Sequence, residues 1–170
     1  MSSYIAPERI VPTCKYWKPF KGRGAHAGQS VKVYRNLHHG GYSIVAADGE
    51  HAGLVVARSG HVVLMDALFV VSEAGRQRVI REKKKNVHAY ALGTLTWALD
   101  PALAKHESDM PRFAAGDLTE ISYNPYKMSS FYVRRQWESV NTVTPVHAAW
   151  LVHLTPIGCY GQIGEYENYG

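Results

Sequence analysis

The sequence has few cysteines and no long apolar run. Cys14 and Cys159 are the two cysteines in 170 residues, and with no export signal ahead of them we expect free thiols rather than a disulfide. A membrane-spanning helix needs roughly 18 continuous apolar residues, and no stretch approaches that length. The first residues, Met1 to Tyr4, lack the charged and apolar regions of a secretory signal. We therefore expect one intracellular domain with no membrane contact.

Charged residues of one sign are missing from long parts of the chain. From Arg9 to Ala47 there are seven basic residues and no acidic one, whereas the last 35 residues hold three glutamates and no Lys or Arg. A third segment, Glu73 to Lys85, has six basic residues against two acidic ones, and the whole chain carries a formal net charge of +5. This segregation predicts a polyanionic partner, either nucleic acid or an acidic host protein. A solvated surface without such a partner stays an open alternative.

Short alternating or apolar segments recur along the chain and predict a β-dominated α+β fold with antiparallel sheets. The expected strands span residues 31–35, 42–47, 54–57, 61–65, 68–71, 87–92, 94–97, 120–123, 130–134, 148–154 and 160–163. Turns are expected at Gly40-Gly41, at Asp48-Gly49 and over residues 124–127. Ser59-Gly60, between two apolar runs, predicts a tight hairpin.

One short basic helix is predicted over residues 72–85. Ser72 has the side chain of an N-cap, Glu73 lies where the helix dipole favours an anion, and Asn86 is the expected C-cap. Gly75 is expected to weaken this helix by about 1 kcal/mol relative to alanine.

Changes in composition divide one compact domain into four parts. Residues 1–30 predict an irregular basic-aromatic arm, because they contain prolines and glycines and no sustained periodicity. Residues 31–98 predict a β-rich lobe that includes the helix, and residues 118–170 predict a second small β lobe. A linker or long loop is expected between them, over residues 99–117.

Two segments are candidate binding sites, because they carry cations in settings suited to a polyanion. In the arm, cations that neutralise phosphates alternate with rings that stack on unpaired bases. In the helix, arginines can fork a phosphate or a carboxylate. The predicted binding residues are Lys15, Tyr16, Trp17, Lys18, Phe20, Lys21, Arg23, Arg76, Arg78, Arg81 and Lys85. The alternatives are an arm that docks on its own sheet or on a neighbouring subunit, and a solvated helix face.

Nothing in the sequence assembles a convincing enzyme. His153-Leu154-Thr155 has the H-x-[ST] pattern of two-histidine phosphoesterases, and His88 is the candidate for a second histidine, although Tyr90 replaces its hydroxyl partner. His88, His153 and Thr155 are therefore the catalytic candidates, and buried structural histidines are the alternative. No C-x-x-C or H-x-x-x-H spacing anchors a metal ion, and no phosphate-binding or dinucleotide-binding loop is present. We expect no metal site and no cofactor.

Several stretches of this sequence resemble a group of small proteins encoded by tailed bacteriophages. The residues that carry the resemblance are 31–38, 42–44, 71–90, 123–127, Phe131 and 145–147. It covers roughly residues 31 to 155. The resemblance implies a phage gene product that acts in the bacterial host cytoplasm or is carried in a virion, and it implies no particular activity.

These observations lead to three hypotheses of function. The first is a phage-encoded, non-enzymatic binding module that contacts nucleic acid, or a host protein that handles nucleic acid, through the basic surface of the arm and the helix. The second is a virion structural or accessory component whose arm docks on a neighbouring subunit, as in a homo-oligomer. The third is a small hydrolase that resembles two-histidine phosphoesterases.

Overall fold

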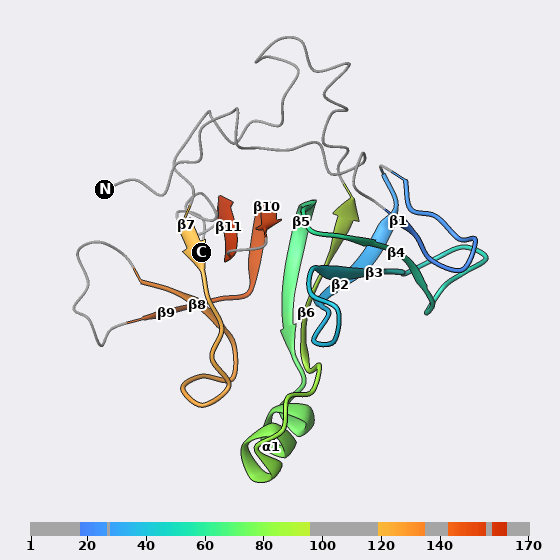
Figure 1. The fold of residues 1–170 in the computed structure, drawn as a ribbon. Helices are drawn as coiled ribbons and strands as arrows, with labels where there is room; N and C mark the ends of the chain where they lie inside the picture. Colours follow the sequence, from blue (N-terminus) through green and yellow to red (C-terminus); the bar gives the residue numbers. More distant parts are fainter. Residues whose placement is uncertain (1–17, 27, 96–118, 135–142, 156–157, 163–170) are drawn as a thin grey trace.

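The computed structural model describes residues 18–26, 28–95, 119–134, 143–155 and 158–162, without the side chain of Thr155. In this part of the chain, one helix accompanies a nine-stranded sheet and a two-stranded sheet (Figure 1). All the strand pairs are antiparallel. The prediction of a β-dominated α+β fold with antiparallel sheets and one short helix is confirmed.

The strands of the large sheet do not follow one another in sequence order. The elements are β1 (Lys18–Pro19), β2 (Ser30–Arg35), β3 (Tyr42–Ala46), β4 (Val55–Ser59), β5 (Val62–Val71), α1 (Glu73–Glu82), β6 (Ala89–Leu95), β7 (Thr119–Ile121), β8 (Phe131–Val133), β9 (Thr144–Val146), β10 (Ala148–Thr155) and β11 (Gly158–Gln162). The large sheet has the order β1-β4-β3-β2-β6-β5-β10-β11-β7, and β8 pairs with β9. Both edges are short strands, which offer little ladder to a strand of another chain.

The long strand β5 joins the two halves of the chain in one sheet. Leu64 of β5 pairs with Leu95 of β6 on one side and with Val152 of β10 on the other. β5 and β6 belong to the segment expected as the first β lobe, and β10 belongs to the segment expected as the second. The two segments are thus joined by hydrogen bonds between β5 and β10. The linker expected over residues 99–117 lies outside the described residues.

A bulge in β5 corrects one sequence-based prediction. Residues 61–65 and 68–71 were expected as two strands, but they belong to one strand whose register shifts between Met65 and Leu68. Asp66, at the shift, has a φ of 52°. The extra residue returns Leu64 and Phe69 to the same buried face, although a spacing of five residues would place them on opposite faces of a regular strand.

The predicted hairpin at Ser59-Gly60 is wrong. β4 pairs with β3 and β1, whereas β5 pairs with β6 and β10, so the two strands that flank this turn are not partners. The chain instead turns a corner, where Ser59 Oγ donates to His61 O at 2.7 Å and accepts from His61 N at 3.1 Å. In Figure 1, β3 and β4 accordingly run across the direction of β5 and β6. Local apolar runs indicate that strands exist and do not decide which strands pair.

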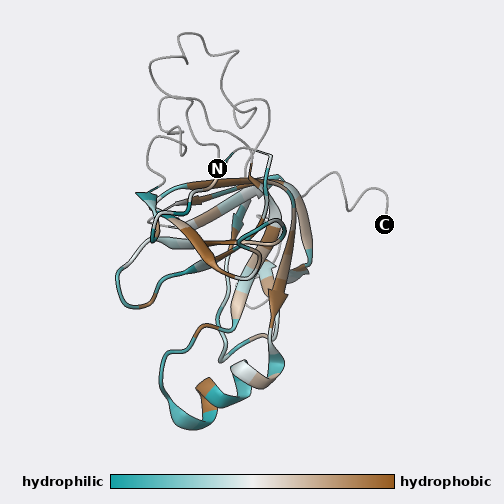
Figure 2. Ribbon diagram, turned by 90° about the vertical axis from the view of Figure 1, so that its right-hand side faces the viewer, coloured by the Kyte–Doolittle hydropathy of each residue, from teal (hydrophilic) through white to brown (hydrophobic). Residues whose placement is uncertain are grey.

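One face of the large sheet forms the core. Val31, Val33, Ile44, Leu64 and Leu95 are all at most 1% exposed, and they come from four neighbouring strands. Burial of such side chains stabilises a fold by about 1.5–3 kcal/mol each. Figure 2 shows hydrophobic strands gathered together and a largely hydrophilic α1 set apart from them. No helix in the described part of the chain is long and apolar enough to cross a membrane.

The helix begins where the sequence predicts and ends earlier. Ser72 is the N-cap, and its Oγ accepts from Gly75 N at 3.2 Å, so this prediction is confirmed. The expected C-cap at Asn86 is wrong, because Lys83 adopts the left-handed conformation and donates its N–H to Val79 O. Only Val79 of α1 is buried. With so little apolar surface to bury, the helix has no packing to hold its basic end in further turns.

Candidate functional site

The described part of the arm docks on the protein's own sheet. Lys18 pairs with Arg58, and Phe20 N donates to Val56 O at 3.1 Å, which makes β1 the edge strand beside β4. Arg23, a predicted binding residue, is held inward because its Nη1 donates to Val55 O at 3.0 Å. The side chains of Lys18 and Lys21 remain exposed. Three predicted binding residues lie outside the described residues, namely Lys15, Tyr16 and Trp17.

Phe20 brings two cations together at the edge of the sheet. The Arg58 guanidinium lies 4.6 Å from the centroid of the Phe20 ring, and Lys21 Nζ lies 5.4 Å from it. Arg58 Nε is buried and has no hydrogen-bond partner in the part of the chain that the structure describes. Both cations are therefore attracted to a ring instead of a carboxylate.

A second aromatic and cationic group lies on the face of the sheet opposite the core. Val31 and Val33 point into the core, so Lys32 and Tyr34, which alternate with them, point to the other face. Lys32 Nζ lies 4.3 Å from the centroid of the Tyr90 ring on the neighbouring strand β6. On the other side of β3, this pair repeats the arrangement of Arg58 and Phe20.

Strand pairing places these groups on one surface. Tyr34 pairs with Ser43, Ser43 with Arg58, and Arg58 with Lys18, so the four side chains form a row across β2, β3, β4 and β1. Lys32 lies two residues from Tyr34 on the same face. We call this surface the basic-aromatic face and define it by Lys18, Phe20, Lys32, Tyr34, Arg58 and Tyr90. Lys18 is exposed and the other five residues are half-buried.

The five strands beneath the basic-aromatic face contain no acidic residue. Their sequences are KP in β1, SVKVYR in β2, YSIVA in β3, VVARS in β4 and AYALGTL in β6. The ion pairs found among the described residues all lie on α1. Lys18, Lys21, Lys32 and Arg58 therefore have no described carboxylate as a partner. Cations in this state are available to neutralise phosphates.

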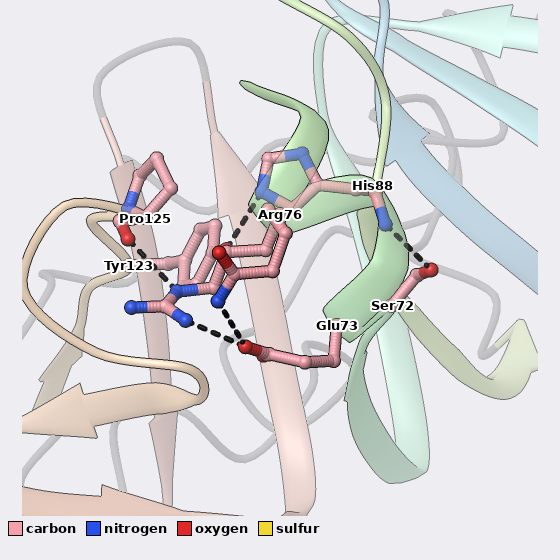
Figure 3. Close-up of polar contacts among 8 residues, drawn as sticks. Ser72, Glu73, Arg76, His88, Tyr123 and Pro125 are labelled. Carbon is pink, nitrogen blue, oxygen red and sulfur yellow. Dashed lines mark hydrogen bonds and ion pairs between the residues drawn. The ribbon is translucent and has the colours of Figure 1, made fainter. Parts of the chain in front are cut away.

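Arg76, predicted to bind a partner, instead fastens α1 to the loop between β7 and β8. Its Nε donates to Pro125 O at 2.8 Å, and its Nη1 forms an ion pair with Glu73 Oε1 at 2.7 Å (Figure 3). Its side chain is only 15% exposed. The β-turn predicted over this loop is confirmed, because Lys127 N donates to Asn124 O at 3.0 Å. Arg76 is thus a structural residue of the described chain.

The other helix cations are exposed and lie at the C-terminal end. Arg78 Nε forms an ion pair with Glu82 Oε2 at 3.0 Å, and Arg81 is 3.9 Å from the same carboxylate. Lys85, with Lys83 and Lys84, is exposed beyond the end of α1. Of the four helix residues predicted to bind, Arg76 is therefore held by a carbonyl, Arg78 and Arg81 share the Glu82 carboxylate, and Lys85 is exposed.

His88 forms a brace between the sheet and the same loop. His88 Nδ1 lies 2.7 Å from Asn86 O. His88 Nε2 lies 2.6 Å from the Tyr123 hydroxyl (Figure 3). A carbonyl oxygen only accepts, so Nδ1 donates, and in the neutral ring Nε2 then accepts from the hydroxyl. Burial raises the pKa of Tyr123 to about 12, which keeps that proton in place. Tyr123 stacks in turn on Phe131, which contacts Phe69 of the core.

The structure does not bring His88 and His153 together. His153 pairs with Val63, whereas Ala89, next to His88, pairs with Val71, eight residues further along β5. At about 3.3 Å per residue these positions are roughly 26 Å apart. The described chain thus has no two-histidine site of the phosphoesterase kind built from this pair. The third catalytic candidate, Thr155, ends β10, and the structure does not describe its side chain.

His153 is a buried structural histidine beside His61. It is 1% exposed, and the centroids of the two rings are 5.7 Å apart. Burial, together with the nearby His61, lowers the pKa of His153 to about 3, so the ring is neutral near pH 7. Among the described residues, no three His, Cys, Asp or Glu side chains gather in an arrangement that could hold a metal ion.

Comparison of the sequence with known proteins identifies a phage family. A family model described as the Mycobacterium phage L5 gene 82 protein matches residues 24–162. The chain belongs to this family. The gene 82 protein of Mycobacterium phage L5 is 37% identical over 134 residues, which cover 75% of this chain and 91% of the relative. No solved structure matches the chain. The resemblance to small phage proteins, found from the sequence, is confirmed.

The gene 82 family match includes most of the basic-aromatic face. It contains β2, β3, β4 and β6, which carry Lys32, Tyr34, Arg58 and Tyr90, whereas Lys18 and Phe20 precede it. These four residues were not among the predicted binding residues. The alternation of Val31 to Arg35 already indicated that Lys32 and Tyr34 share the face away from the core. Only the strand order shows that Arg58 and Tyr90 lie on the same surface.

Proposed function

We propose that this member of the gene 82 family is a non-enzymatic nucleic-acid-binding module that acts in the bacterial host cytoplasm and binds through the basic-aromatic face. The observation that carries the proposal is the group of five acid-free strands on which Lys18, Lys32 and Arg58 lie beside rings or other cations. When these cations displace the counterions of a phosphate, no carboxylate on those strands repels that phosphate.

The rings favour nucleic acid over an acidic protein as the partner. Phe20, Tyr34 and Tyr90 lie among the cations of the face. Nucleic acid presents phosphates to the cations and bases to the rings, whereas an acidic protein surface presents mainly carboxylates. A protein partner held by the cations alone would tolerate loss of the rings. Substitution of these rings by aliphatic residues therefore distinguishes a nucleic-acid partner from an acidic protein partner.

The salt dependence of binding tests the proposal. Four cations lie on or beside the face without a described carboxylate partner, namely Lys18, Lys21, Lys32 and Arg58. If each neutralises one phosphate of a single strand, the affinity should fall about 50-fold between about 50 and 200 mM salt, from a slope of roughly −0.7 per phosphate. Fluorescence anisotropy with a labelled 15-nucleotide strand measures this slope.

A pair of charge variants assigns the slope to the face. Lys32→Gln combined with Arg58→Gln should reduce the magnitude of the slope by about 1.4. The control is Lys127→Gln, because Lys127 is exposed in the loop after β7, at the opposite edge of the sheet from β1. Far-UV circular dichroism verifies that all variants are folded. Absence of binding, or an affinity independent of salt, would contradict the proposal.

A further inference from the structure

Two rings of the basic-aromatic face, Tyr34 of β2 and Tyr90 of β6, lie on neighbouring strands. Val33 of β2 pairs with Ala91 of β6, and both point into the core. The register of β2 with β6 ends at this pair, and Tyr34 and Tyr90 are the next residues of the two strands, so both are on the face opposite the core. Lys32 holds the Tyr90 ring by a cation–π contact at 4.3 Å. Two rings and a cation therefore lie on the same face of two neighbouring strands.

We infer that this face binds a single strand of nucleic acid, with unpaired bases stacked on Tyr34 and Tyr90 and phosphates held by Lys18, Lys32 and Arg58. The inference rests on the proposed function and names the class of nucleic acid. Stacking on aromatic rings tolerates any base, since each base has a π face, and it requires that the base is not paired inside a duplex. The face thus selects for single strands through its rings and adds affinity through its cations.

The width of the face argues against a duplex as its ligand. The face extends over β1, β4, β3, β2 and β6, which are consecutive in the sheet. Four strand spacings of about 4.8 Å make it roughly 19 Å wide. The major groove of a duplex is about 12 Å wide and admits a helix or a two-stranded ribbon. A five-stranded face cannot enter that groove, and its rings cannot reach paired bases.

The helix is the element that could enter a groove, and its charges are arranged differently. Glu73 lies at its start and Glu82 at its end, and both form ion pairs with arginines of α1. Arg76 is held by Pro125 O and does not face solvent freely. The acid-free face is therefore the stronger candidate for nucleic acid, and preferential binding of a duplex would indicate α1 instead.

Ring substitutions on the intact chain test the inference. We expect labelled dT15 or U15 to bind at least tenfold more tightly than the duplex of dT15 with dA15 in fluorescence anisotropy. Tyr34→Leu and Tyr90→Leu should each weaken single-strand binding by about tenfold, because the stacking surface is lost. Tyr34→Phe and Tyr90→Phe keep the ring and should restore most of that binding. Tyr126→Leu is the matched control, since Tyr126 is 61% exposed in the loop after β7.

The outcomes separate this inference from the proposed function. Salt-dependent binding that is equal for single strand and duplex, and unaffected by the leucine variants, would overturn the inference and leave the proposed function in place. Absence of binding to all three probes would overturn both. If a leucine variant fails to fold, as judged by its melting curve, a folded Tyr34→Gln or Tyr90→Gln variant replaces it in the comparison with the phenylalanine variant. Stacking predicts that the glutamine variant binds about tenfold more weakly than the phenylalanine variant, and equal binding by the two would overturn the inference.

Discussion

His153 should make the stability of this protein depend on pH. Its ring is buried next to that of His61, and burial together with this neighbour lowers the pKa of His153 to about 3. In the unfolded chain the group has the ordinary histidine pKa near 6.5. Between these two values the unfolded state binds a proton that the folded state does not. The free energy of unfolding therefore falls as the pH falls through this window.

The size of the effect follows from the two pKa values. Each pKa unit corresponds to about 1.4 kcal/mol, so the free energy of unfolding should fall by about 2 kcal/mol between about pH 7.5 and pH 5.0. His61, whose pKa is also lowered by burial, acts in the same direction. The range lies above the ordinary pKa of Asp and Glu, so that carboxylates add little to the change.

Urea denaturation at a series of pH values, followed by intrinsic fluorescence, measures this dependence. His153→Gln removes the titrating group, and its free energy of unfolding should fall about 2 kcal/mol less than that of the parent over the same range. His39→Gln is the control, because His39 is exposed between β2 and β3, and it should keep the parental dependence. Equal pH dependence of the parent and His153→Gln would refute the reasoning, whatever their absolute stabilities.

Two further substitutions examine the contacts of α1 with the sheet. Gly75→Ala would normally gain about 1 kcal/mol of helix propensity, but here the new Cβ would lie 2.6 Å from His88 Cβ. We expect a lower melting temperature, with a loss of about 1–3 kcal/mol, and a higher one would show that His88 can move away. Tyr123→Phe leaves His88 Nε2 without its 2.6 Å partner and should lower the free energy of unfolding by about 1 kcal/mol. Unchanged urea denaturation would mean that water replaces the hydroxyl.

Local chemistry was enough to predict much of the fold. Alternating apolar and polar residues identified β2, and the two glycines Gly40 and Gly41 identified the turn to β3. Both glycines have positive φ, a conformation that residues with a Cβ adopt at a cost. Ser72 was recognised as an N-cap because its hydroxyl competes for the first amides of a helix. These features depend on neighbours in sequence, and so the sequence reveals them directly.

Features that depend on distant residues could not be predicted in the same way. The bulge at Asp66 joins two expected strands into β5, and it is understood only once Leu64 and Phe69 are seen to share the core. A glycine at position 75 lowers helix propensity, but a tertiary contact explains its presence, because His88 occupies the space that a side chain at position 75 would need. β9 was missed altogether, because three residues are too few to show a period.

The candidate site shows why a count of charges is an incomplete guide to a binding surface. Eight cations were predicted to bind: Lys15, Lys18, Lys21, Arg23, Arg76, Arg78, Arg81 and Lys85. Arg23 and Arg76 bind backbone carbonyls and Arg78 binds a carboxylate, whereas Lys32 and Arg58, which were not predicted, have no described acidic partner.

The salt slope of single-strand binding distinguishes the two sets of cations. Eight phosphate contacts would give a slope of about −5.6, and the four cations Lys18, Lys21, Lys32 and Arg58 would give about −2.8. These values correspond to losses of roughly 2,000-fold and 50-fold between about 50 and 200 mM salt, a difference that anisotropy resolves easily. A slope near the smaller value, reduced further by Lys32→Gln with Arg58→Gln, would assign binding to the basic-aromatic face. A slope near the larger value, insensitive to that pair, would assign it to the arm and the helix.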